Sequence, residues 1–535
     1  MATAGGLEYA GGTGARSLAR GGAVHAKADT PLVLRYNPAG LAELRGGSFI
    51  GSFNVALHQA CFDAYGFYGW GVGDAMGDAE LTAPGGQRDV IALDAPDYLG
   101  EPLPEVCMKQ AVTMIPNGAL SYRLTESLGV GFGMIFPSAM PGGRWADGHG
   151  LIRNDAGELR PSPARHMMVA SGTTGIFPTL GVGYRVTDYL RLGVALQWGI
   201  VWADLTVNTA KDPGNEPGDD VLNRIIGEDL FVPGVNASVH LVPMDAVDAV
   251  LTFRWQDDIE LDRTTIYATT GVFEQREQPL ADQELFLTTI EQPLPWSATL
   301  AIRYADRLLP RPTGTGRGEA ALGDIRDPMR DERWDVELDV QYQFNGRVDR
   351  TVARPDDTCD AQLQGCSQII TERTDSDVPD VIAFPSEAQR DGIVIERRWR
   401  DQVSVRLGGS YNVLPGLLSL HAGAHWENRG IDPAYMTPDA WPLARVGLHT
   451  GVTYRYRMLD FTLAYGHIFQ ETLRVGSPDI DGAAVDPSEP ADVDAVAAFE
   501  QQAGREQAGE QPAIVNAGQY VSALELFAFS IMAHF

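Results

Sequence analysis

A two-residue alternation of apolar and polar side chains runs through this chain from about residue 46 to the C-terminus. Between Trp334 and Phe344, one set of alternate residues is apolar, and the other set contains Asp335, Glu337 and Asp339. A β-strand points successive side chains to opposite faces, whereas a helix repeats roughly every 3.6 residues. The alternation therefore predicts strands that each have one apolar and one polar face.

The alternation predicts an all-β fold with about fourteen strands, joined by connections that are short and long in turn. The expected strands span 47–61, 110–124, 128–138, 176–187, 189–208, 230–243, 247–269, 284–306, 333–348, 397–413, 417–428, 441–456, 458–471 and 519–535. Tight turns at one end and long loops at the other are typical of outer-membrane barrels. The exception is a long polar stretch at 307–332, where a short turn is due.

The apolar faces of these strands are expected to point outward. About fourteen strands in one closed sheet enclose a lumen too wide for apolar side chains to fill. The apolar face must then meet lipid, and the polar face must line the lumen. Inward charges can pair across strands, as Arg303 with Glu337 or Asp339, and Asp339 with Arg406. Closure also removes sheet edges, which lipid cannot hydrogen-bond.

Composition excludes several classes of protein. The net charge of −30 argues against nucleic-acid binding, which needs clustered Lys and Arg. No stretch approaches the roughly 18 apolar residues of a spanning helix. Cys61 and Cys107 bracket the first predicted long loop, and Cys359 and Cys366 lie within another. Both pairs are on the predicted outer side, which suggests the disulfides Cys61–Cys107 and Cys359–Cys366. Neither pair has a zinc-site spacing, so we expect no metal and no cofactor.

Residues 1–45 are rich in glycine and lack the alternation, so they cannot form a wall strand. Within them, Pro38 fixes its own backbone and keeps Asn37 out of the helical region, which predicts a rigid turn at Asn37-Pro38-Ala39-Gly40. With the preceding Gly14-Ala15-Arg16 element, this turn resembles the start of the FadL family of outer-membrane long-chain fatty acid transporters. The alternating C-terminal strand that ends in Phe535 likewise resembles the ends of bacterial outer-membrane proteins.

The resemblance implies a single transmembrane antiparallel barrel, 46–535, with a hatch formed by 1–45 inside its lumen. It implies passive, hatch-gated uptake of long-chain fatty acids or other hydrophobic small molecules by a monomer. The barrel would lie among the lipid and lipopolysaccharide of a Gram-negative outer membrane, without enzymatic activity. The hatch residues would be Asn37, Pro38, Ala39 and Gly40.

The resemblance also implies a sideways exit at a kinked third strand, in which Gly131, Gly133 and Pro137 would bend the chain. Inward arginines that could meet a ligand carboxylate are Arg254, Arg303, Arg406 and Arg445. The chain has Asp204 late in strand five, where long-chain transporters can carry an arginine. This departure leaves room for neutral hydrophobic compounds.

Two alternatives remain open at this point. One is a general water-filled porin, which would have no reason to begin with a plug such as 1–45. The other is an outer-membrane barrel enzyme, for which His421, His425 and Glu427 on one inward face are the candidate residues.

Overall fold

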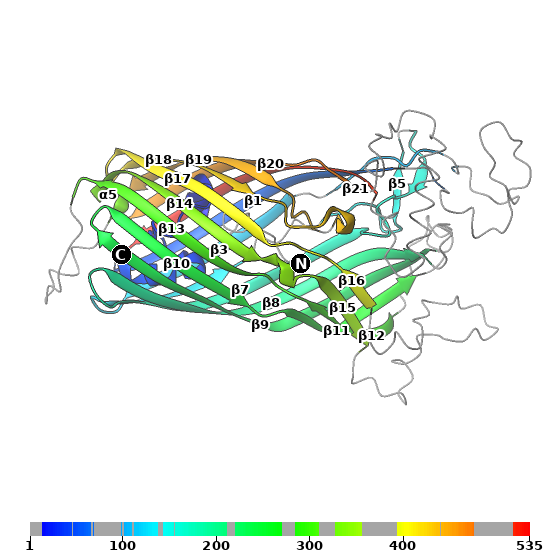
Figure 1. The fold of residues 1–535 in the computed structure, drawn as a ribbon, viewed down its shortest axis with the longest axis horizontal. Helices are drawn as coiled ribbons and strands as arrows, with labels where there is room; N and C mark the ends of the chain where they lie inside the picture. The colour runs from blue at the N-terminus through cyan, green and yellow to red at the C-terminus, as the bar shows by residue number, and fades with distance from the viewer. Residues whose placement is uncertain are drawn as a thin grey trace, which may run out of the picture.

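The computed structural model describes most of the chain as one barrel (Figure 1). The described residues are 13–44, 46–65, 68, 98, 101–109, 112–136, 143–154, 156–210, 220–269, 284–309, 327–355, 393–438, 440–475 and 517–535. Short connections gather at one end, on the left of Figure 1, and long ones at the other. We call these the turn end and the loop end.

Fourteen of the described strands form a closed antiparallel ring, as the alternation predicts, because each pairs with the next and the last pairs with the first. They are β1 (Gly47–Ala64), β3 (Val112–Arg123), β4 (Leu128–Ile135), β7 (Ala170–Arg185), β8 (Leu190–Ala210), β9 (Asp220–Met244), β10 (Val247–Gln256), β13 (Trp296–Arg307), β14 (Glu332–Phe344), β17 (Gln402–Leu414), β18 (Leu418–Glu427), β19 (Arg445–Tyr456), β20 (Leu459–Gln470) and β22 (Gly518–His534).

Several predicted strands are interrupted toward the loop end. The ring continues there as β11 (Ile259–Thr269), β12 (Glu284–Gln292), β15 (Arg350–Pro355) and β16 (Ile393–Glu396). The break between β12 and β13 contains Pro293 and Pro295, which have no N–H to donate to the ladder. Between β14 and β15 the chain forms the short helix η4 (Asn345–Arg347). The predicted continuous strands 247–269 and 284–306 are therefore each split, and the strand predicted at 333–348 ends at Phe344.

Several short strands and one short helix lie at the loop end. They are β2 (Val106–Cys107), the hairpin of β5 (Leu151–Arg153) and β6 (Leu159–Pro161), the helix η5 (Pro433–Tyr435) and β21 (Leu473–Val475). At the turn end, the stretch predicted as a long polar link forms α5 (Pro328–Asp331) before β14 begins. Residues 310–326 of that link lie outside the described residues.

The apolar faces point outward, as predicted. On β8, Leu192, Leu196 and Trp198 are exposed, whereas Ala195 and Gln197 are buried. The same holds around the ring, and aromatic side chains gather at both edges of the outer apolar band. Those near the turn end include Tyr122, Tyr184, Tyr189, Tyr304, Tyr411, Tyr454 and Tyr456. An apolar outer band with aromatic edges is the surface that a barrel presents to a bilayer.

The inward charges pair, but not all with the partners predicted from the sequence. Arg303 lies opposite Glu337 in the ladder, yet its ion pairs are to Asp248, Asp335 and Glu332. A guanidinium has a long stem and several donors, so it reaches diagonally to carboxylates on both neighbouring strands. Arg406 lies opposite Asp339 in the ladder and donates a hydrogen bond to Gln341.

The N-terminal segment, residues 13–44, lies inside the ring (Figure 1, dark blue). It forms only α2 (Ala15–Ala19), α3 (Val33–Tyr36) and η1 (Pro38–Glu43). The helix α2 contacts β18, β19, β20 and β22, while η1 contacts β4, β7, β8 and β9 on the other side of the barrel. Among the described residues, no helix has the length and apolar character needed to cross a membrane.

Candidate functional site

The turn at Asn37 is buried in the barrel interior and is bonded mainly within the N-terminal segment. Asn37 Nδ2 donates to the His25 carbonyl oxygen at 2.7 Å and lies 3.4 Å from His240 Nδ1 on β9. Pro38 opens η1, and the Ala39 N–H donates to Ser238 Oγ at 2.8 Å. A Cβ at Gly40 would lie 2.6 Å from the Ala28 Cβ, so only glycine fits there. The turn thus joins two parts of the segment and one patch of wall.

Glycines on the inner face of β4, β7 and β8 let the segment approach the wall backbone. A Cβ at Gly193 would lie 2.0 Å from the Ala39 nitrogen, and one at Gly131 would lie 2.8 Å from Leu41 Cδ2. Gly133 is near Leu34 in the same way. Gly131 and Gly133 therefore have a packing role that the sequence did not indicate.

Within its described residues, β4 pairs regularly with both neighbours, without a bulge at Gly131 or Gly133. The strand has 8 residues, whereas β3 has 12 and β7 has 16, so both neighbours extend beyond it toward the loop end. The predicted kink at Pro137 lies outside the described residues. The apolar Leu34, Leu41 and Ile135 form one buried cluster at this part of the wall.

At the loop end, a large buried apolar cluster combines residues of the strands with residues of the described loops. Trp441 lies at its centre, stacked on Trp145 with ring centroids 5.9 Å apart. Tyr520 and His58 meet the same Trp441 ring edge-on, at 5.7 Å and 5.8 Å. The rings are buried against one another, so this cluster is a packed apolar core at that end of the barrel.

A second apolar cluster lines the inner wall next to the first one. Its members come from β7, β8, β9, β11 and β12, and Leu294 packs against both clusters. They are Phe177, Val201, Ala203, Val232, Ile259, Leu261 and Ile290. The interior is therefore apolar from the loop end down one flank. Around the N-terminal segment the wall carries both buried charged residues and apolar clusters.

Among the inward arginines named from the sequence, two are ion-paired inside the wall. Arg303 contacts three carboxylates, and Arg445 Nε donates to Glu427 Oε2 at 2.5 Å. Arg254 and Arg406 instead lie near the N-terminal segment. Burial, together with the positive charges of Arg406 and Arg254, lowers the pKa of His25 to about 3. The His25 ring itself lies against the wall carboxylate Asp339, with Nδ1 2.8 Å from Oδ2.

Arg35 in α3 is a residue that the sequence reasoning missed. It is buried, and burial together with the neighbouring Arg254 lowers the pKa of Arg35 well below its ordinary value. Arg35 therefore lies near enough to Arg254 for the two positive charges to interact. No alternation marks residues 13–44, so the sequence offered no signal that Arg35 points at the wall.

The histidines considered for an enzyme have partners typical of a polar lining. His421 lies between Ser410 Oγ and Thr453 Oγ1, at 2.9 Å and 2.8 Å. His425 Nδ1 is 2.9 Å from His449 Nε2, while Glu427 is paired with Arg445. Nucleophilic catalysis needs an accessible nucleophile beside its base. Ser410, the hydroxyl beside His421, is instead buried and also accepts a hydrogen bond from Arg20.

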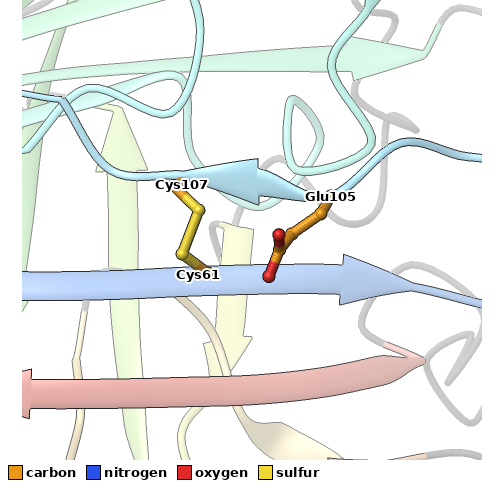
Figure 2. A group of neighbouring side chains, drawn as sticks. All are labelled: Cys61, Glu105 and Cys107. Carbon is orange, nitrogen blue, oxygen red and sulfur yellow. A yellow bond between two sulfur atoms is a disulfide. The ribbon is translucent and has the colours of Figure 1, made fainter. Parts of the chain in front are cut away.

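Cys61 on β1 and Cys107 on β2 form a disulfide at the loop end (Figure 2). Glu105 lies beside them, and the three side chains are close enough to share a metal ion. Because both sulfurs are in the disulfide, neither can supply the thiolate that such a site needs. Cys359 and Cys366 lie outside the described residues.

No family model matches the sequence, and no curated protein matches it. Solved structures with the same fold do match over nearly the whole chain. A FadL homologue of Pseudomonas aeruginosa has 14% identity and a TM-score of 0.59, with 98% of each chain covered. The toluene transporter TodX of Pseudomonas putida has 13% identity and a TM-score of 0.56, covering 98% of this chain and 99% of that one.

The toluene transporter TbuX of Ralstonia pickettii is similar at 11% identity and a TM-score of 0.53, covering 99% of this chain and all of that one. At these identities the likeness establishes the fold. The chain therefore has the barrel fold of FadL-type channels.

Proposed function

We propose that this chain is a FadL-family channel for passive uptake of hydrophobic small molecules across a Gram-negative outer membrane. Residues 46–535 form the transmembrane barrel, and residues 1–45 form a hatch in its lumen. The protein acts as a monomer surrounded by lipid and lipopolysaccharide, and it is not an enzyme.

The observation that carries this proposal is the division of the barrel interior. The half near the turn end is filled by residues 13–44, and the half near the loop end is lined by the apolar clusters around Trp441 and Leu294. A general porin needs an open polar lumen, which this interior does not offer along its described residues. An apolar entry above a removable segment suits hydrophobic solutes.

The ligand class extends to molecules with a carboxylate, such as long-chain fatty acids. The positive charges of Arg254 and Arg406 act on His25 of the N-terminal segment, and that of Arg254 acts on Arg35. Guanidinium groups that converge in a low-dielectric interior attract a carboxylate strongly. Arg303 and Arg445 are ion-paired to wall carboxylates, so a ligand carboxylate would compete with those contacts. Neutral hydrocarbons would use the apolar clusters alone.

The exit is proposed at β4. Leu34 and Leu41 of the hatch pack there against the glycine-lined wall, and β4 is shorter than both neighbours. A ligand released by movement of the hatch would meet an apolar wall at this strand. Gly131 and Gly133 would then provide space for the hatch, and the kink proposed at Pro137 would form the exit beside them.

The test is uptake into proteoliposomes of a C18 fatty acid, toluene and a small hydrophilic sugar. The wild type should admit the first two and exclude the sugar, and deletion of 1–45 should admit all three. Arg254→Gln should reduce fatty acid uptake about tenfold, the value of a hydrogen bond to a charged group, and leave toluene unchanged. The control is Arg224→Gln, an exposed guanidinium paired with Asp204.

Two results would contradict the proposal. Sugar entry through the wild type at the rate of the deletion would establish the porin reading. Equal loss of fatty acid and toluene uptake in Arg254→Gln would mean that Arg254 supports the fold and does not recognise the carboxylate.

A further inference from the structure

Three carboxylates on β14 face the N-terminal segment from inside the barrel. Asp335, Glu337 and Asp339 occupy alternate positions of the strand, and each is buried. Burying three carboxylates on one strand is costly unless each one finds cations or hydrogen-bond donors. The donors come largely from one loop of the segment, residues 20–27.

The backbone of this loop supplies four consecutive N–H donors to two of the carboxylates. The Ala26 and Lys27 nitrogens donate to Glu337 Oε1 and Oε2 at 2.6 Å and 3.1 Å. The Val24 and His25 nitrogens donate to Asp339 Oδ2 at 3.2 Å and 3.4 Å. Successive N–H groups that point into one concavity form an anion-binding nest.

Left-handed backbone on each side of the nest turns its amides toward the wall. Gly21 and Gly22 have φ of 64° and 85° before the nest, and Ala28 has φ of 47° after it. Glycine adopts this conformation without steric cost, and a non-glycine residue does so rarely. Ala28 therefore indicates that contacts with the surroundings hold the loop in this shape.

Side chains of the same loop pair with the remaining charge. Arg20 bridges Asp335 at 2.9 Å and Glu337 at 3.1 Å, and Lys27 Nζ lies 2.6 Å from Asp335. The wall is shaped for this contact, because a Cβ at Gly408 or Gly423 would lie 2.3 Å from the Arg20 carbonyl oxygen. The loop and β14 thus match in charge and in shape.

We propose that Glu337, with Asp335 and Asp339 beside it, is the positioning residue that holds the hatch in the lumen and sets how often it leaves. When the loop moves away, all three carboxylates lose their amide and cationic partners together. Movement of the hatch away from β14 therefore costs free energy, and weakening the interactions of Glu337 lowers that cost. This inference rests on the proposed function, in which hatch movement admits ligand.

The test is Glu337→Gln in the full-length protein, reconstituted in detergent micelles and in planar bilayers. The glutamine amide keeps an oxygen that can accept from the Ala26 N–H. Its NH₂ group, however, would face the Lys27 N–H, so two donors would oppose each other. Because the amide is neutral, the ion pair with Arg20 is also lost. Amide hydrogen exchange of residues 24–27 should accelerate about tenfold or more, and steady conductance should rise with it. Exchange in β14 and its neighbouring strands should stay unchanged.

The matched control is Glu427→Gln, which alters an equally buried carboxylate on β18. Glu427 pairs with Arg445 and accepts from Ser404, both in the wall. It should leave exchange at residues 24–27 at the wild-type rate. A second variant, Lys27→Met, removes the ion pair between Lys27 and Asp335 from the hatch side and leaves every wall residue unchanged. Lys27→Met should accelerate exchange at residues 24–27 less than Glu337→Gln does. It still tests the inference if Glu337→Gln fails to assemble.

Wild-type exchange at residues 24–27 in Glu337→Gln or, if that variant does not fold, in Lys27→Met would overturn the inference. Equal acceleration in Glu427→Gln would also overturn it, because the effect would then be general softening of the wall. Faster exchange and higher conductance without any change in hydrophobic uptake would support the role of Glu337 in holding the hatch. That result would count against the proposed function instead.

Discussion

Replacing Asn37 with alanine should loosen the hatch without unfolding the barrel. The side chain is buried, and its Nδ2 donates to the His25 carbonyl at 2.7 Å. Alanine leaves that carbonyl without this donor, at a cost of about 1–3 kcal/mol. The backbone bonds from Asn37 N to Val33 O and from Gly40 N to Asn37 O remain, so the turn itself persists.

The size of the effect of Asn37→Ala follows from the partners of the Asn37 side chain. A loss of about 1–3 kcal/mol raises the population of a displaced hatch about 5- to 150-fold. The effect should fall near the lower end, because Asn37 Oδ1 is buried without a hydrogen-bond partner among the described residues, and alanine removes that unsatisfied acceptor too. It should also be smaller than that of Glu337→Gln, since the Asn37 bond joins two parts of the hatch itself.

The assay is ion conductance in planar lipid bilayers. The wild type should conduct little, deletion of 1–45 should give a large steady pore, and Asn37→Ala should lie between them. Asn412→Ala is the control, because its Nδ2 also donates to backbone carbonyls, those of Pro328 and Glu332 at the turn end. If Asn37→Ala matches the wild type while the deletion conducts, Asn37 does not hold the hatch. Equal conductance of wild type and deletion would remove the hatch altogether.

Two further variants test the packing and the disulfide. Gly193→Ala should displace the hatch and raise conductance, because the added Cβ would lie 2.0 Å from the Ala39 nitrogen; a folded variant that stays closed would show that the close approach does not matter. Oxidised protein should migrate faster than reduced protein on a denaturing gel, and Cys107→Ser should remove most of this shift, since it breaks the Cys61–Cys107 link. A shift that survives in Cys107→Ser would have to come from elsewhere in the chain.

The alternation of side chains was enough to predict the wall of the barrel. Strands such as β8 and β14 fall close to their predicted ranges, and their apolar residues face outward. This works because a strand has only two faces, so one period assigns every side chain on it. The strand breaks near the loop end were missed, because alternation alone does not locate a break.

The partners of the inward charges could not be predicted from the sequence. Arg303 pairs with Asp335 and Asp248, not with Glu337 or Asp339, because the reach of its guanidinium across both neighbouring strands decides which carboxylates it meets. Glu337 finds its donors more than 300 residues away in the chain. A local sequence pattern cannot indicate a contact between residues so far apart in the chain.

The N-terminal segment shows the same division. Its lack of alternation and its Asn37-Pro38 turn indicated that residues 1–45 stand apart from the wall. Which of its groups meet the wall depends on how a chain without regular structure packs inside a closed ring. The backbone amides of Val24 to Lys27 and the buried Arg35 became visible only in the tertiary structure. Backbone N–H groups are the same in every residue except proline, so a sequence cannot mark which four will surround a carboxylate.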